Sequence, residues 1–217
     1  MKILLISDEV SPALYDHYIP GRLDGYDLLI SCGDLKPQYL SFLVTMTRVP
    51  LLYVHGNHDD CYERIPPDGC DCIEDKLVVY KGLRILGLGG SVRYNPGVNQ
   101  YTEAQMRWRI FKLKWKIRRH KGVDLVVSHA PLYGVGDGED VAHRGFEAFL
   151  KFVDTYHPKY WVHGHMHLNY GIDKTRVREY NGTKVVNATE RYVLEIPDEL
   201  IANHNKKGDI DYAHYAK

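Results

Sequence analysis

The sequence lacks an apolar run long enough to cross a membrane, and it lacks an excess of either charge. Lys plus Arg and Asp plus Glu both number 28, so the formal net charge is zero. A balanced charge gives no general attraction to nucleic acid or acidic lipid, so neither is expected as a main partner. The apolar stretch from Ile3 to Ile6 is too short for a signal peptide, and we expect a cytoplasmic protein with no membrane partner.

Cysteine is also scarce, with four residues at positions 32, 61, 70 and 72. Structural zinc sites usually use a Cys-x-x-Cys spacing, whereas a single residue separates Cys70 from Cys72. The sequence therefore favours free thiols in a reducing compartment over a metal bound by cysteine.

Neither internal repeats nor low-complexity tracts divide the 217 residues, which suffice for one domain with a buried core. We expect this domain over residues 1–196 and a polar tail over 197–217. Apolar periodicity predicts strands over 2–7, 27–31, 51–55, 77–80, 83–88, 124–128, 159–162, 176–180, 184–187 and 192–196. Helices are predicted over 37–48, 102–120 and 145–156. Strands that alternate with helices and then form hairpins indicate an α/β or α+β fold with mixed sheets and outer helices.

Potential metal ligands follow five of the predicted strands. In chain order they are Asp8, Asp34, Asn57 with His58, His129, and His165 with His167. Sites in open α/β sheets collect at the carboxyl ends of strands, so these side chains are expected to lie together. In an extended segment, residues two apart point to the same side, and we therefore expect His165 and His167 to aim at one spot.

The donor types indicate which ions this site would take. Imidazole, carboxylate and amide groups suit Mn, Fe, Zn, Ni or Mg. The donors are too numerous for a single ion, which predicts two divalent metal ions. Two ions about 3.5–4 Å apart can activate a water and neutralise both ends of an in-line displacement at phosphorus. The alternative for each residue is that it only stabilises the turn after a strand.

The combined motifs resemble those of the calcineurin-like metallophosphoesterases. They are Gly33-Asp34, Gly56-Asn57-His58-Asp59, His129 and Gly164-His165-Met166-His167. The resemblance spans about residues 1–196 and implies a four-layer α/β/β/α sandwich of mixed sheets flanked by helices. It also implies a phosphoesterase whose substrate is a small phosphodiester or phosphomonoester, attacked by a metal-bound hydroxide.

The resemblance further implies a role for each motif residue. Asp34 bridges two ions, of which one is also held by Asn57, His129 and His165, and the other by Asp8 and His167. His58 lies beside the scissile phosphate as a general acid for the leaving group or as a charge stabiliser. Asp59 either orients His58 or is a plain loop carboxylate.

The first motif departs from the family pattern Asp-x-His, because Val10 stands where the pattern has a histidine. The ion held by Asp8 thus loses one imidazole, and we expect it to bind more weakly and to be completed by water. Glu9 is expected to point the other way in an extended segment, while His17 could fold back from the following loop. The weaker site admits an alternative function, that of a non-catalytic or single-metal scaffold protein on the same fold.

Two loops are candidates for substrate binding. Arg93 follows Gly89-Gly90-Ser91 and could hold a phosphate oxygen, although a plain connector is the alternative. His143 and Arg144 end the loop that begins after His129, and they could contact substrate or merely start the next helix.

The helix predicted over 102–120 carries two apolar stripes. Met106, Ile110, Leu113 and Ile117 share one stripe, and Trp108, Phe111 and Trp115 lie nearly opposite. Basic residues, Arg109 among them, lie between the stripes. One stripe is expected to face the core, and the other predicts a contact between copies of this chain in a homo-oligomer. Binding of nucleic acid through the aromatic and basic residues is the weaker alternative.

Overall fold

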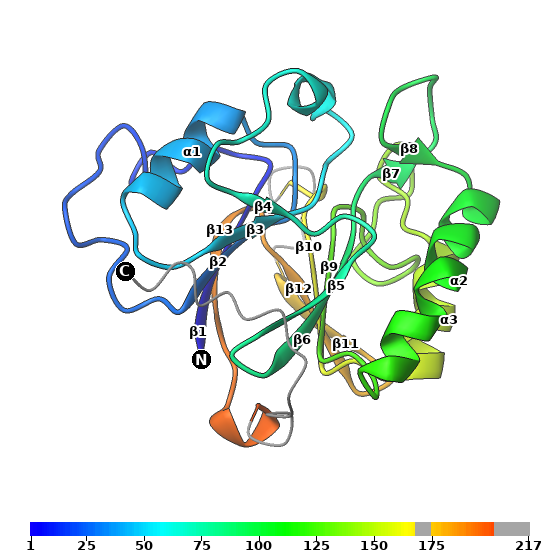
Figure 1. Ribbon diagram of the computed structural model, residues 1–217. Helices are drawn as coiled ribbons and strands as arrows, with labels where there is room; N and C mark the ends of the chain where they lie inside the picture. The colour runs from blue at the N-terminus through cyan, green and yellow to red at the C-terminus, as the bar shows by residue number, and fades with distance from the viewer. Residues whose placement is uncertain (168–174, 202–217) are drawn as a thin grey trace.

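The computed structural model describes residues 1–167 and 175–201, and it stacks two β-sheets between outer helices (Figure 1). The five-stranded sheet has the order β13-β1-β2-β3-β4. Its strands are Glu190–Glu195, Lys2–Ser7, Leu28–Ser31, Leu51–Tyr53 and Asp71–Cys72. All neighbours in this sheet are parallel except β13, which runs antiparallel to β1.

The six-stranded sheet has the order β11-β12-β10-β9-β6-β5. Its strands are Val177–Tyr180, Thr183–Asn187, Tyr160–His163, Leu125–Ser128, Leu83–Leu88 and Leu77–Tyr80. The inner strands are parallel and both edge strands are antiparallel, as the two predicted hairpins require. A small third sheet pairs β7 (Ser91–Val92) with β8 (Gln100–Tyr101).

Three apolar clusters explain the layered order. One cluster fills the space between the two sheets and includes Ile3, Ile30, Val127 and Val162. A second packs α2 (Glu103–Arg119) and α3 (Glu147–Tyr156) against the six-stranded sheet, and a third packs α1 (Pro37–Thr45) against the other sheet. Burial on both faces fits the near-continuous apolar runs of the parallel strands. The predicted α/β/β/α sandwich is confirmed.

Several predicted boundaries were wrong. The helix α1 ends at Thr45 rather than residue 48, and α3 begins at Glu147 rather than residue 145. The two-residue strands β4, β7 and β8 were missed, because segments this short carry no periodicity. The 3-10 helices η1 (Asp60–Glu63) and η2 (Asp198–Leu200) were missed as well, and η2 lies within the predicted tail. The rest of that tail, residues 202–217, lies outside the described residues.

The four cysteines are free thiols, as predicted. Within the described residues, the helices are all too short or too polar to span a membrane.

Candidate metal centre

The carboxyl ends of β1, β2, β3, β9 and β10 lead into loops that meet at one place. Two glycines permit this close approach, since a Cβ atom at Gly56 would overlap the Asp34 carboxylate. A Cβ atom at Gly164 would likewise overlap the Ser7 hydroxyl. The motif glycines are therefore required by the contact between loops as well as by the turns themselves.

The tautomers of two histidines are set by backbone carbonyl groups. In His129, Nδ1 lies 2.8 Å from the carbonyl oxygen of Cys32, so Nδ1 donates its proton and Nε2 keeps a lone pair. In His165, Nε2 lies 2.6 Å from the carbonyl oxygen of Ala142, so Nδ1 keeps the lone pair. These two lone-pair nitrogens lie only 3.1 Å apart.

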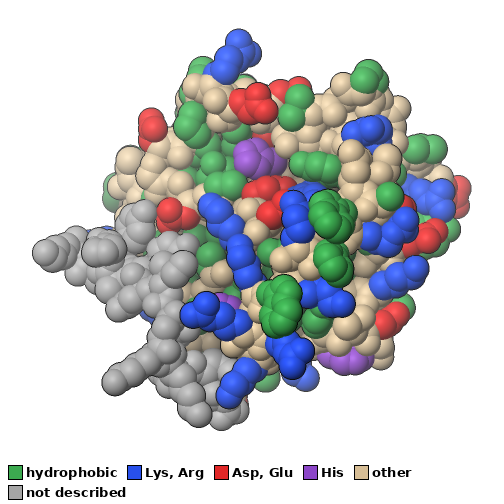
Figure 2. Space-filling view, turned by 45° about the vertical axis from the view of Figure 1, so that its right-hand side comes forward, with side chains coloured by type: hydrophobic (Ala, Val, Ile, Leu, Met, Phe, Trp, Pro, Cys, Tyr) green, Lys and Arg blue, Asp and Glu red, His purple; other side chains and the backbone are tan. Residues whose placement is uncertain are grey.

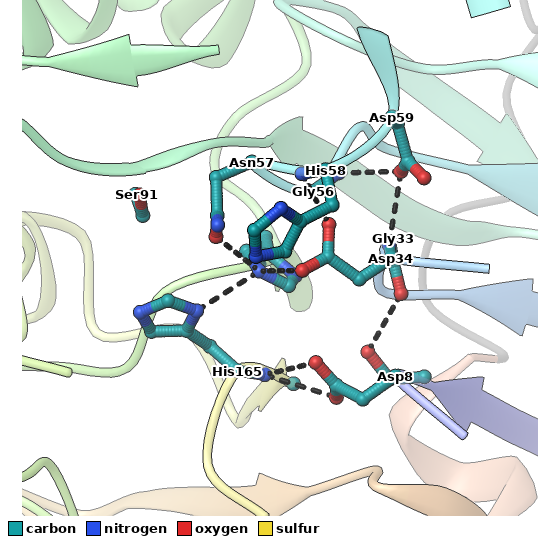
Figure 3. A network of polar contacts seen from close by, with 12 residues as sticks. Asp8, Gly33, Asp34, Gly56, Asn57, His58, Asp59, Ser91 and His165 are labelled. Atoms are coloured by element: carbon teal, nitrogen blue, oxygen red, sulfur yellow. Dashed lines mark hydrogen bonds and ion pairs between the residues drawn. The ribbon is translucent and has the colours of Figure 1, made fainter. Parts of the chain in front are cut away.

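Two oxygen acceptors complete this arrangement (Figure 3). The His129 Nε2 atom lies 2.9 Å from Asn57 Oδ1 and 3.3 Å from Asp34 Oδ2. Donor atoms of Asp34, His129 and His165 all lie within 4.8 Å of one another. Four acceptors that face one another in a buried place repel unless a cation lies between them. The arrangement thus fits a divalent ion with mixed nitrogen and oxygen ligands.

The pKa values of the site express the same electrostatics. Burial alone lowers the pKa of His129, but the charge of Asp34 and its hydrogen bond raise that pKa to about 10. Burial raises the pKa of Asp34, yet His129 holds it well below its usual range. Burial and the nearby His129 lower the pKa of His165 to about 3. The raised pKa of His129 and the lowered pKa of Asp34 both express the attraction between positive and negative charge at this place, and a metal ion would supply that positive charge.

Asp8 lies beside this group of three rather than within it. Its two carboxylate oxygens each accept the His165 backbone N–H at 3.0 Å, and Thr189 donates from Oγ1 at 3.3 Å. Burial raises the pKa of Asp8, while the charges of His129 and His167 oppose that rise. Asp8, Asp34 and His165 all have positive φ angles, of 63°, 56° and 66°. Strained backbone of this kind often marks a functional site.

The expectation that His165 and His167 aim at one spot was wrong. It assumed extended backbone, whereas the positive φ of His165 turns the chain between the two rings. His165 joins His129, and His167 contacts Glu9, with Nδ1 and Oε1 2.9 Å apart. Glu9, which was expected to point away in an extended segment, lies at a turn and contacts His167. His17 is exposed in its loop.

His58 and Asp59 take different positions. The backbone N–H of His58 donates to Asp34 Oδ1 at 2.8 Å, and its side chain is exposed at the rim of the site. The Asp59 carboxylate is buried beneath the loops, where Oδ2 accepts the backbone N–H groups of Asp34 at 2.9 Å and Gly56 at 2.7 Å. These bonds tie together two ligand loops, and neither runs to the His58 ring.

Of the proposed substrate residues, His143 packs against a residue of the centre. Its ring is 5.4 Å from the His165 ring, and its Nδ1 lies 2.8 Å from Asp140 Oδ2. Arg144 instead lies over the Tyr133 ring, 4.6 Å from its centroid.

Arg93 is exposed, and Nη2 donates to the Gln100 carbonyl oxygen at 3.2 Å. Its neighbour Tyr94 was not among the predicted site residues, yet the Tyr94 hydroxyl accepts from Asn57 Nδ2 at 3.1 Å. This contact turns Asn57 Oδ1 toward His129. The signal in the sequence was a tyrosine in the loop that already contained Arg93. Only the fold shows that Tyr94, rather than Arg93, contacts Asn57.

A four-layer sandwich whose strand ends gather carboxylate, amide and imidazole donors defines a metallophosphoesterase fold. The family model for calcineurin-like phosphoesterase matches residues 1–169, which include every motif residue described above. The chain belongs to the calcineurin-like phosphoesterase family.

Solved structures support the fold. One crystal structure, with a TM-score of 0.62, is 17% identical and aligns over 89% of this chain and 94% of its own. The crystal structure of TT1561 of Thermus thermophilus, with a TM-score of 0.55, is 14% identical over 87% of this chain and 89% of its own. No curated protein matches the sequence.

Proposed function

We propose that this chain is a metal-dependent phosphoesterase that hydrolyses a phosphodiester or a phosphomonoester. The convergence of acceptor atoms from Asp34, Asn57, His129 and His165 carries the proposal, because this set suits a divalent cation. The family membership of the chain supports the reaction class.

The donor types suit divalent ions such as Mn, Fe, Zn, Ni or Mg, and we propose that two ions bind. One ion would take the ligands Asp34, Asn57, His129 and His165, and the other would take Asp8, Asp34 and His167. Bound ions would supply an activated water and neutralise charge on the phosphoryl oxygens. The second position has one imidazole fewer than the family pattern and is proposed to bind its ion more weakly.

The residues of the chain itself do the remaining work. The carbonyl groups of Cys32 and Ala142 hold the two histidine tautomers, so the ligand set needs no rearrangement. His58 stands exposed beside Asp34, where it donates a proton to the leaving oxygen or stabilises charge that develops there. His143 lies against His165, and in this proposal it contacts the substrate.

The test is hydrolysis of bis(p-nitrophenyl) phosphate and p-nitrophenyl phosphate with each of the five metals. We expect His58→Ala to lower kcat by at least about 100-fold, as the loss of a general acid does. Because His58 is exposed, the variant should keep its fold and its melting temperature. The control is His17→Ala, which removes another exposed histidine and should leave the rate unchanged. A wild-type chain inactive on both esters with every metal would refute the proposal.

A scaffold function is the second candidate, favoured by one observation. Trp108, Phe111 and Trp115 on α2 are 60%, 54% and 78% exposed, which is typical of an interaction surface. A scaffold protein has no need for His58. A wild-type chain that hydrolyses no ester but binds a partner through this aromatic surface would therefore favour the scaffold function.

A further inference from the structure

The family pattern and this chain differ at the tenth residue, and the structure shows where that side chain lies. Val10 is half-buried and packs against the apolar cluster that contains Leu14 and Tyr39. It therefore contributes packing and no donor atom. The second metal site proposed above, at Asp8, Asp34 and His167, would therefore have two carboxylates and one imidazole.

Glu9 reaches His167 because the backbone turns at the preceding residue. The positive φ of Asp8, 63°, ends the extended strand, and the Glu9 N–H donates to the Ser7 carbonyl oxygen at 2.6 Å. The turn directs the Glu9 side chain toward the last ligand loop, where Oε1 lies 2.9 Å from His167 Nδ1. The pair joins residues 158 positions apart in the chain.

This contact fixes which nitrogen of His167 can bind a metal. A carboxylate only accepts hydrogen bonds when ionised, so Nδ1 must carry the proton. The lone pair of His167 is then on Nε2, and Nε2 is the nitrogen through which the ring would bind a metal ion. Carboxylates that accept the second N–H of a metal-bound imidazole hold the ring in place and raise its basicity.

We propose that Glu9 is a positioning residue that holds His167 as an Nε2 ligand of the second metal ion. The inference rests on the proposed function, since it requires that second ion. Glu9 offsets part of what is lost with the family histidine, through charge and ring orientation rather than through a metal bond.

The experiment measures metal binding by calorimetry and the tautomer of His167 by ¹⁵N NMR. We titrate Mn²⁺ into metal-stripped full-length protein and compare wild type with Glu9→Ala and Glu9→Gln. Wild type should bind two ions, and Glu9→Ala should weaken the weaker site by about 10–100-fold while sparing the tighter one. Glu9→Gln keeps an oxygen acceptor, so its weaker site should lose less affinity for Mn²⁺ than that of Glu9→Ala. Glu195→Gln removes an exposed carboxylate near the opposite end of β1 and serves as the matched control.

The NMR measurement uses the metal-free protein at pH 8, where it does not depend on catalysis. Wild type should show protonated Nδ1 and bare Nε2 in His167, and Glu9→Ala should shift the ring toward the other tautomer. A single bound ion in wild type, an unchanged tautomer, or unchanged affinity would each overturn the proposal. Equal losses in Glu9→Gln and Glu9→Ala would also overturn it, by indicating that the carboxylate binds the metal directly. A protein that shows the expected binding and tautomer but hydrolyses no ester would refute the proposed function and leave the role of Glu9 intact.

Discussion

At the scale of single residues, Asp59 shows how a buried carboxylate can serve the site without touching substrate. Its Oδ2 atom accepts backbone N–H groups from the loops of Asp34 and Gly56. Burial and the charge of Asp34 raise the pKa of Asp59 to about 6. The folded protein therefore binds the Asp59 proton more tightly than the unfolded chain does. The contribution of Asp59 to stability is fully present below pH 4 and is lost as pH rises to about 6.

Because the pKa of Asp59 is raised, two substitutions at this position should have opposite effects on the stability of the metal-free protein. Asp59→Asn keeps an oxygen acceptor without the charge, so it should gain up to about 3 kcal/mol over wild type between pH 4 and 6. Asp59→Ala leaves both N–H groups without this acceptor and should cost about 2–6 kcal/mol, from about 1–3 kcal/mol for each group. Urea unfolding at pH 4 and pH 7 measures both changes. A difference between Asp59→Asn and wild type that is independent of pH would contradict the assigned cause.

The sequence sufficed to identify most residues that meet at the centre. Asp34, Asn57, His129 and His165 each follow a parallel strand, and the carboxyl ends of such strands share one edge. The position of Glu9 was not predictable, because the extended-strand argument fails where Asp8 takes a positive φ. A positive φ at aspartate is uncommon, and here it depends on contacts with residues far along the chain.

At the scale of elements, α2 is linked to the ligand loops through a buried ion-pair network. Arg109 donates to Asp75 Oδ1 at 2.9 Å and to the Gly89 carbonyl oxygen at 2.8 Å, and it also pairs with Glu74. Glu74 Oε2 in turn accepts the N–H of His55, which directly precedes the Gly56-Asn57 motif. The helix thereby supports the loop that carries a metal ligand.

We expect Arg109→Ala to cost about 3 kcal/mol of unfolding free energy at pH 7, because it removes the buried guanidinium that pairs with the half-buried carboxylates of Glu74 and Asp75. Burial raises the pKa of Glu74, but His55 and Arg109 hold it below the ordinary 4.5. The contribution of the pair is present above pH 4.5 and is lost as pH falls further. The cost of the substitution should therefore shrink in urea unfolding at pH 4.

Arg107→Ala is the control, since Arg107 is exposed and lies 3.9 Å from Glu103 on the same helix. Its effect should stay below about 1 kcal/mol. Equal costs for the two arginines would contradict the buried network.

The helical period predicted which apolar residues of α2 face the core. Met106, Leu113 and Ile117 are buried, and Thr102 begins the helix with a capping box that includes Gln105. Arg109 was grouped with the basic residues between the two stripes, yet it is buried. The periodicity of a helix does not reveal a charged partner, and the turn that presents Glu74 and Asp75 is visible only in the fold.

At the scale of the whole molecule, the neutral net charge conceals an uneven distribution. Figure 2 shows apolar side chains among Lys and Arg on the face that α2 covers. The exposed basic residues of this helix are Arg107, Lys112, Lys114, Lys116, Arg118 and Arg119. Its one acidic residue, Glu103, accepts N–H groups at the start of α3. The net charge of the whole chain is an average over its surface. The structure shows that the α2 face is locally basic, and this local charge would act on a partner that binds there.

The predicted contact between two copies through α2 has a distinctive dependence on salt. Burial of Trp108, Phe111 and Trp115 favours association, whereas the basic residues of both copies oppose it. The screening length falls from about 10 Å at 0.1 M salt to about 3 Å at 1 M, so association should strengthen as salt rises. Light scattering over this range of salt concentration measures the association of two copies. Trp115→Gln should weaken the association. The control Val193→Ser, at an exposed position on β13, should leave the association unchanged. Binding to a polyanion would instead weaken with salt. A chain that stays monomeric throughout and binds anionic polymers only at low salt would overturn the contact between copies.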